Sequence, residues 1–392
     1  MRSLFFNTQK KIEGGMIKVD VKHLGQVFTP PFLVKNMLKL RKNKGTILEP
    51  SCGDGAFMNE LEASCVGIEF DSTKCPQKAL NMDFFDYPIE HQFDTIIGNP
   101  PYVKYQQILD ETKQKLEMSL FDERSNLYLF FIYKCFLHLK KGGELIFVVP
   151  KDFLKATSSL KLNQLLYDNG TFTHLIDLSD QDVFEGYSPD CIIFRYVKGC
   201  FERHLADGRY FSCHNGFLNF TKQEYLIPFN ELFSVKVGAL SGANELFEHP
   251  SGNVEMVFSK TVSTGKTKRF FYNTPATELA PFKELLMKRK VKRITEKNWY
   301  EWGRIFYDSD QERIYVNCLT RVPQPFFYHE CKGYESAVLA IFPKFDFDLD
   351  LAIKLLNEVD WEDLGFKNGG RFHFSQKSLE NCLLPESFKA LF

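Results

Sequence analysis

The chain has 392 residues, of which 44% are hydrophobic and 25% charged, and its formal net charge is −1. The length is enough for two or three domains, the composition is typical of a globular protein, and the charge balance excludes a uniformly basic surface for nucleic acid. No run of 18 apolar residues predicts a membrane span, and the ten cysteines lack paired spacing. We therefore expect reduced thiols, no metal site, no membrane partner and a cytoplasmic location.

The first 200 residues alternate strand-like and helix-like stretches. Residues 127–139 are apolar nearly all round and predict a buried helix that ends at Gly142–Gly143, and another helix is expected after residue 57. Short apolar segments predict strands at residues 46–49, 65–69, 93–97, 144–150, 175–178 and 191–197. Alternating strands and helices form βαβ units, so we predict an α/β fold with a doubly wound, mostly parallel, Rossmann-like sheet.

The sequence pattern changes near residue 200. Beyond it, aromatic residues, charges and short strands mingle without the earlier rhythm. We predict a first domain over residues 1–205, an irregular junction over residues 206–228, and a second, α+β domain over residues 229–392.

A glycine-rich loop, ILEPSCGDGAF at residues 47–57, joins the first predicted strand to the segment that follows it. Gly53 and Gly55 allow the backbone to approach a ligand closely and to adopt positive φ. In open α/β sheets, ligands bind at the carboxyl ends of strands. The loop carries Glu49 and Asp54, which repel phosphate but suit an ammonium or hydroxyl groups.

Acidic residues also follow the next strands. Glu69 ends the second strand, about 20 residues downstream, where a carboxylate can bind a ribose diol. Asp83 beside Phe84 offers an acceptor and an aromatic face for adenine. A site for an amino acid, a ribose and an adenine together indicates S-adenosyl-L-methionine as the cofactor.

The segment TIIGNPPYVKY, residues 95–105, ends a strand in an amide, two prolines and a tyrosine. Proline fixes φ and lacks a backbone donor, so the strand stops there. One interpretation is a rigid turn capped by a surface tyrosine. The other is a stiff loop that holds the Asn99 amide, a carbonyl and the Tyr102 ring in fixed positions.

In order, the segments GQVFTPPFLV, LEPSCGDGAF, GIEFD, DFFDY, GNPPYV and GGELIFVVP resemble the gamma-class DNA adenine-N6 methyltransferases of type II restriction–modification systems. The resemblance covers about residues 24–200 and continues weakly beyond them. Residues 236–247 and 370–385 resemble the opening and the close of the family's target-recognition domain. The NPPY tetrapeptide alone is not specific, because methyltransferases of protein glutamine also carry it.

The resemblance implies a role for each matching residue. Asn99, Pro100, Pro101 and Tyr102 would contact the target adenine, and Phe184 would stack on its other face. The Asn99 side-chain oxygen and the Pro100 carbonyl would accept the two amino N–H groups, after the base is flipped out of the duplex. The cofactor-binding set is Thr29, Glu49, Pro50, Ser51, Cys52, Gly53, Asp54, Gly55, Glu69, Phe70, Asp83, Phe84 and Asn99.

The resemblance also implies partners: double-stranded DNA, a separately encoded restriction endonuclease, and a monomeric enzyme in the bacterial cytoplasm. Residues 283–304 and 259–269 are rich in Lys and Arg, and with Trp299, Tyr300 and Trp302 they predict a phosphate-contacting surface. A solvated helix face is the alternative. Two other functions stay open: methylation of RNA adenine or protein glutamine, and a DNA-binding specificity subunit with a relict cofactor site.

Overall fold

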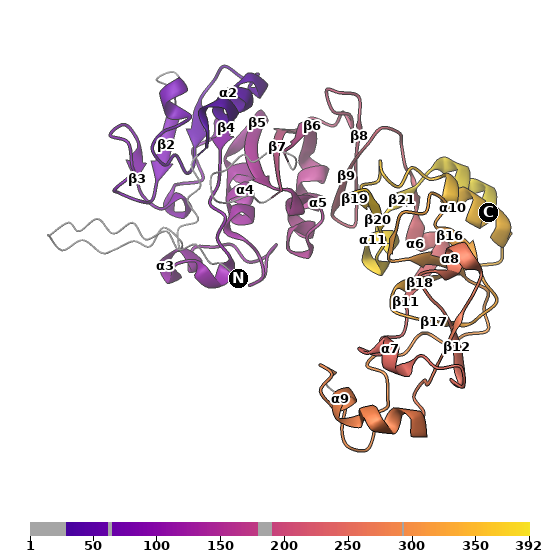
Figure 1. Cartoon of the computed structure of the whole chain (residues 1–392). Helices are drawn as coiled ribbons and strands as arrows, with labels where there is room; N and C mark the ends of the chain where they lie inside the picture. Colours follow the sequence, from indigo (N-terminus) through magenta and orange to yellow (C-terminus); the bar gives the residue numbers. More distant parts are fainter. Residues whose placement is uncertain (1–28, 62–64, 179–189, 292–293) are drawn as a thin grey trace. The chain divides into compact units, whose positions relative to one another are not determined.

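The computed structural model describes residues 29–61, 65–178, 190–291 and 294–392 (Figure 1). The chain divides into two compact units, the first reaching Glu202 and the second beginning at Arg203. The first unit is built on a seven-stranded sheet in the order β3-β2-β1-β4-β5-β7-β6. Its strands are β1 (Ile47–Glu49), β2 (Cys65–Glu69), β3 (Leu80–Asn81), β4 (Phe93–Gly98), β5 (Leu139–Pro150), β6 (Gly170–Asp177) and β7 (Cys191–Lys198).

The sheet is parallel except at β7, which pairs antiparallel with both β5 and β6. This confirms the predicted doubly wound, mostly parallel fold. The strand order reverses at β1, which pairs with β2 on one side and β4 on the other. At such a switch point the loops after the two diverging strands open a crevice, which is where ligands bind in this class of fold.

The described helices of the first unit are α2 (Pro31–Leu40), α3 (Asp110–Lys113), α4 (Leu127–His138) and α5 (Leu160–Asn169). Helix α4 is buried along most of its length, as its apolar composition predicts. It ends at His138 and passes directly into β5, so Gly142 and Gly143 lie in the strand instead of stopping the helix. The glycine pair lies where β5 slips register against β4, and Gly142 adopts the left-handed conformation, with φ of 78°.

The prediction of a helix after residue 57 is wrong. The described residues of this segment form only a short 3-10 turn at Met58–Glu60. Because β2 already begins at Cys65, the connection is too short for a helix of ordinary length.

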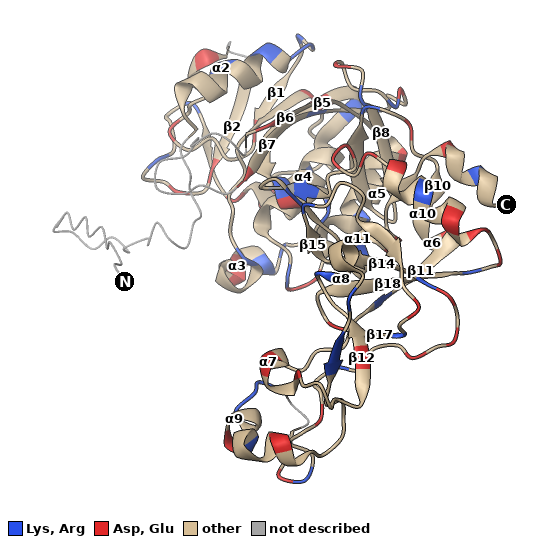
Figure 2. Cartoon of the chain, turned by 45° about the vertical axis from the view of Figure 1, so that its right-hand side comes forward, with Lys and Arg blue, Asp and Glu red and all other residues tan. Residues whose placement is uncertain are grey.

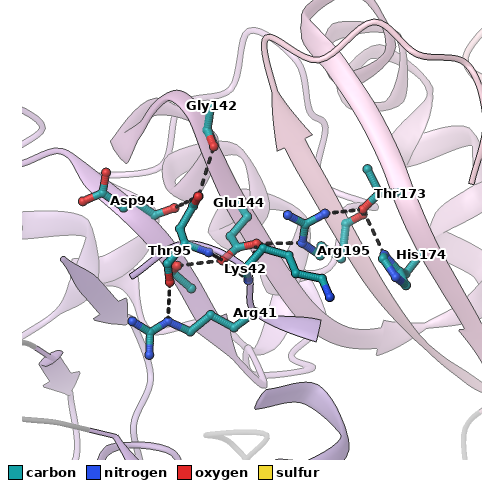
Figure 3. A network of polar contacts seen from close by, with 10 residues as sticks. Arg41, Lys42, Asp94, Thr95, Gly142, Glu144, Thr173, His174 and Arg195 are labelled. Atoms are coloured by element: carbon teal, nitrogen blue, oxygen red, sulfur yellow. Dashed lines mark hydrogen bonds and ion pairs between the residues drawn. The ribbon is translucent and has the colours of Figure 1, made fainter. Parts of the chain in front are cut away.

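The buried carboxylate of Glu144 lies beside Thr95, near the start of β4, and joins several segments of the first unit (Figure 3). Glu144 has no exposed surface, and its carboxylate accepts hydrogen bonds from the backbone N–H groups of Lys42 and Asn43. It also accepts from the Thr95 hydroxyl at 2.9 Å and from Arg195 Nε at 2.6 Å. These contacts fix the segment after α2 to β4, β5 and β7.

The second unit contains a central antiparallel sheet of β11 (Phe233–Val237), β18 (Val338–Pro343), β14 (Ile314–Asn317) and β16 (Phe326–Tyr328), in that order. Both faces of this sheet are buried. Val338, Ala340 and Phe342 pack into one hydrophobic cluster, while the alternate residues Leu339 and Ile341 pack into another. The period of two along β18 places its side chains on opposite faces, so one strand serves two cores.

The remaining elements of this unit are short helices and strands, in keeping with an α+β domain. The helices are α6 (Phe229–Leu232), α7 (Asn244–Phe247), α8 (Thr261–Thr264), α9 (Lys283–Met287), α10 (Leu349–Glu358) and α11 (Gln376–Glu380). The strands are β8 (Tyr210–His214), β9 (Phe217–Thr221), β10 (Ile227–Pro228), β12 (Val254–Val257), β13 (Lys268–Phe270), β15 (Leu319–Thr320), β17 (Gly333–Tyr334), β19 (Lys367–Asn368), β20 (Arg371–His373) and β21 (Leu383–Leu384).

Residues 206–228, predicted as an irregular junction, fold within the second unit. Strands β8 and β9 form a hairpin whose turn contains Asn215 and Gly216, both at positive φ, and β10 pairs with β21 near the C-terminus. The hairpin forms because an Asn-Gly pair favours a tight turn between strands and because Phe211 and Leu218 are buried. Among the described helices, none combines the length and apolarity needed to cross a bilayer.

Candidate active site

Three sequence-predicted residues meet at the switch point of the first unit. Asn99, which follows β4, donates from its side-chain Nδ2 to the hydroxyl of Thr29 at 3.2 Å. The hydroxyl of Ser51, in the glycine-rich loop after β1, donates to the backbone carbonyl of Asn99 at 3.1 Å. The parallel pairing of β1 with β4 brings these loops to one edge of the sheet. Residues that are far apart in sequence therefore form one polar cluster.

The glycine-rich loop adopts the backbone conformation that its glycines permit. Gly53 and Gly55 have φ of 53° and 86°, a region that other residues rarely adopt. A Cβ added at Gly53 would meet no described atom within 4 Å, so the backbone there borders open space. Cys52 is turned inward, and burial raises the pKa of its thiol above the ordinary range. Cys52 therefore supports the loop and is no candidate nucleophile.

The acidic residues of the expected cofactor site differ in their surroundings. The Glu69 carboxylate accepts from the backbone N–H groups of Gly53 at 2.7 Å and Asp71 at 2.8 Å, which fixes it beside the loop. Glu49 is 1% exposed and accepts from the N–H of Met58, and burial raises its pKa well above the usual value. Glu49 thus supports the loop from within.

Other loop residues lie closer to solvent. Asp54 is exposed, and the Phe70 ring, next to Glu69, is also exposed. Pro50 is buried below the loop. Both exposed side chains are therefore accessible to a ligand at this edge.

Asp83 and Phe84 lie at the start of a 3-10 turn after β3. The Asp83 carboxylate accepts from the N–H of Phe85 at 2.9 Å and caps that turn. The Phe84 ring is only 2% exposed and packs against Phe131 and His138 of α4. The aromatic face expected for adenine is therefore turned into the core, and the Phe84 backbone is what remains for contact with a ligand.

The NPPY segment is a packed corner and not a surface turn. The Tyr102 hydroxyl donates to the carbonyl of Val148 at 2.9 Å, and its ring meets Tyr128 edge-on with centroids 6.0 Å apart. Pro100 is buried and Pro101 half-buried. The interpretation with a surface tyrosine is thus wrong. Phe184, the remaining predicted base contact, lies outside the described residues.

Sequence reasoning missed two residues beside the expected cofactor site. The Thr112 hydroxyl donates to Asp83 Oδ2 at 2.8 Å, and the Lys115 ammonium lies 3.3 Å from the same oxygen. They are about 30 residues from Asp83 in sequence, and no local motif marks them.

The basic tract of the second unit is partly structural. Arg289 donates to the backbone carbonyls of Ser241, Trp299 and Glu301, which ties the tract to its own unit. Trp302 is buried, and its indole donates to the Phe271 carbonyl at 3.0 Å. The interpretation of Trp302 as part of a binding surface is therefore wrong, because burial and a hydrogen bond hold it in the core. Charges of both signs are interspersed along this unit (Figure 2).

Part of the chain is similar to known restriction–modification methyltransferases. Residues 53–184 match the model of the Eco57I restriction-modification methylase family. The type II methyltransferase M.HincII of Haemophilus influenzae is 36% identical over 194 residues, which are 45% of this chain and 38% of that protein. M.TthHB8I of Thermus thermophilus, also a type II methyltransferase, is 34% identical over 199 residues, 45% of this chain and 46% of its own length.

A solved structure of the type IIL restriction-modification enzyme MmeI in complex with DNA matches 89% of this chain and 63% of that chain, with a TM-score of 0.48 and 12% identity. The match to the curated relatives spans less than half of their length. S-adenosyl-L-methionine is the cofactor expected for such a domain. Residues 53–184 are thus similar to the Eco57I restriction–modification methylases, and the sheet of the first unit has the strand order of a Rossmann-like methyltransferase fold.

Proposed function

We propose that this chain is a site-specific DNA methyltransferase that transfers a methyl group from S-adenosyl-L-methionine to N6 of an adenine flipped out of duplex DNA. The observation that carries the proposal is the cluster of Thr29, Ser51 and Asn99 at the switch point of the sheet. This cluster joins the glycine-rich loop to the NPPY corner. A cofactor bound at the loop and a base bound at the corner would therefore be neighbours.

The residues at this edge fit the cofactor. The backbone at Gly53 borders open space, and the Glu69 carboxylate beside it is the chemical group that binds a ribose diol. Asp83 supplies an acceptor for an exocyclic amino group. When bound, S-adenosyl-L-methionine supplies a methyl group activated by a positively charged sulfur.

The NPPY corner suits the amino group of adenine, whose lone pair is delocalised into the ring. The Asn99 side-chain oxygen and the Pro100 carbonyl would accept its two N–H groups and favour a pyramidal nitrogen. The lone pair would then be localised and directed along the line of attack. The prolines hold that carbonyl in place and offer no competing N–H. Tyr102 and Phe184 are proposed to stack on the flipped base, each worth roughly 1–3 kcal/mol.

The second unit is proposed to hold the DNA as a target-recognition domain. The exposed Lys288 and Lys290 are its candidate phosphate contacts, since Arg289 between them is occupied by backbone carbonyls. We further propose a monomeric bacterial enzyme that acts in the cytoplasm beside a separately encoded restriction endonuclease.

The test offers labelled S-adenosyl-L-methionine and the full chain to duplex DNA, RNA and a release-factor-like protein. We expect label in DNA alone, and N6-methyldeoxyadenosine after digestion to nucleosides and mass spectrometry. Methylated cytosine, or label in RNA or protein, would contradict the proposal. Asn99→Ala should abolish transfer and leave binding of S-adenosylhomocysteine within about threefold, because the substitution removes an acceptor for the target and leaves the cofactor site in place.

A further inference from the structure

Three donors hold the Asp83 carboxylate from two parts of the chain. The N–H of Phe85 bonds to Oδ1 at 2.9 Å, and the Thr112 hydroxyl bonds to Oδ2 at 2.8 Å. The Lys115 ammonium lies 3.3 Å from Oδ2. Asp83 and Thr112 are both buried. Rotation of the carboxylate would break all of these contacts, so its orientation is fixed from outside its own turn.

Lys115 also compensates the negative charge of the turn that carries Asp83. Its ammonium lies 2.5 Å from Asp86 as well as 3.3 Å from Asp83, so one cation neutralises two carboxylates in the same 3-10 turn. Helix α3 and the segment after it follow the NPPY corner in sequence. The contacts of Thr112 and Lys115 hold them against the turn that carries Asp83. The base side and the cofactor side of the proposed site are thereby linked.

We propose that Thr112 and Lys115 are positioning residues for the adenine of the cofactor. They hold the Asp83 carboxylate so that its remaining acceptor position faces the exocyclic amino group. This inference rests on the proposed function, in which Asp83 binds that adenine. A carboxylate has about four acceptor positions, and three are used by the donors named above among the described residues, which leaves one direction for a ligand.

The consequence is selectivity for an amino group over a carbonyl at that ring position. An adenine amino group donates to a carboxylate, whereas hypoxanthine presents a carbonyl oxygen that a fixed carboxylate repels. A carboxylate that is free to rotate would move away from that oxygen and lose the discrimination. Loss of Thr112 or Lys115 should therefore affect selectivity, beyond any general effect on the fold.

The test measures the dissociation constants of S-adenosylhomocysteine and S-inosylhomocysteine for the full chain by titration calorimetry, without DNA. We expect the wild-type protein to prefer the adenosine compound by at least about tenfold. Thr112→Val and Lys115→Met should reduce this ratio to about threefold or less. Thr112→Ser, which keeps the hydroxyl, should retain the wild-type ratio.

Lys113→Met is the matched control, because Lys113 pairs with Asp110 and not with Asp83. It should leave the ratio unchanged. If Thr112→Val and Lys115→Met weaken both ligands equally and preserve the ratio, the two residues only support the fold and the inference fails. A wild-type ratio near one would also overturn it.

The same measurements distinguish failure of the positioning role from failure of the proposed function. Discrimination between the two compounds together with no methyl transfer to DNA would preserve the positioning role and reject DNA as the substrate.

Discussion

The side-chain amide of Asn99 donates to the Thr29 hydroxyl across 3.2 Å, which joins the end of β4 to the residue pair that precedes α2. The two residues are 70 positions apart. Because the amide nitrogen is held by Thr29, the orientation of the whole amide is set by a residue from another segment.

Thr29→Val should therefore lower the rate of methyl transfer. Removing the hydroxyl costs roughly 1–1.5 kcal/mol, which corresponds to about a tenfold loss of kcat. Thr29→Ser should retain the activity. The measurement is kcat for methylation of duplex DNA at saturating substrate, with S-adenosylhomocysteine affinity determined in parallel. A large loss of affinity with unchanged kcat would instead indicate that Thr29 acts on the cofactor.

Glu144→Gln should destabilise the first unit. The substitution removes the charge that faces Arg195 at 2.6 Å and replaces an acceptor oxygen by a donor in a buried network. Breaking a buried ion pair in this way costs about 3–5 kcal/mol. Urea unfolding checks this, with Asp110→Asn as the control. Asp110 forms an exposed pair with Lys113, so its loss should cost less than about 1 kcal/mol; equal effects would refute the network's importance.

Lys134 should make stability depend on pH in the alkaline range. Burial lowers the pKa of its ammonium to about 8, despite the nearby Asp83. The unfolded chain binds the Lys134 proton more tightly than the folded chain does. The buried Lys134 ammonium therefore lowers the free energy of unfolding below pH 8, and this destabilisation disappears as pH rises toward the ordinary lysine pKa of about 10.4. Lys134→Met should therefore gain stability relative to wild type as pH falls from 10 to 7.

Thermal unfolding across that pH range, analysed as the difference between variant and wild type, provides the measurement. A flat difference for Lys134→Met would show that its ammonium titrates at the ordinary lysine value.

Gly238→Ala should destabilise the second unit. A Cβ at this position would lie 2.0 Å from the backbone oxygen of Glu335, and backbone atoms cannot move aside as a side chain can. We expect a loss of about 3 kcal/mol. Gly369→Ala is the comparison, since it has φ of 55° but an added Cβ there would meet no atom of the described residues within 4 Å beyond its chain neighbours, and it should cost about 1 kcal/mol. Similar losses in urea unfolding would contradict the steric explanation.

Lys288 and Lys290 should contribute to DNA affinity through phosphate contacts. Replacing either by alanine should weaken binding of all sequences alike and lower the slope of log affinity against log salt by about one. Fluorescence anisotropy at several salt concentrations provides the measurement. Lys389→Ala, which removes the partner of Glu386, is the control and should change neither quantity. An unchanged slope in the Lys288 and Lys290 variants would exclude phosphate contact.

Local sequence determined much of the first unit. The apolar strands, the buried helix α4 and the glycine-rich loop follow from hydrophobic period and from backbone freedom, which are properties of neighbouring residues. The Asn215–Gly216 pair also carried a turn signal, although residues 206–228 were predicted to be irregular. The segment after residue 57 does not form the predicted helix because its connection to β2 is short. Composition does not reveal the length of that connection.

The sequence by itself determined the fold class and the order of the polar segments, because burial of apolar strands and the freedom of glycine act over short distances along the chain. Only the tertiary structure decided that Thr29 holds Asn99, that Thr112 and Lys115 hold Asp83, and that Phe84 and Trp302 lie in the core. The pairing of strands places these groups side by side, and a hydrogen bond depends on distance in space and not on separation in sequence.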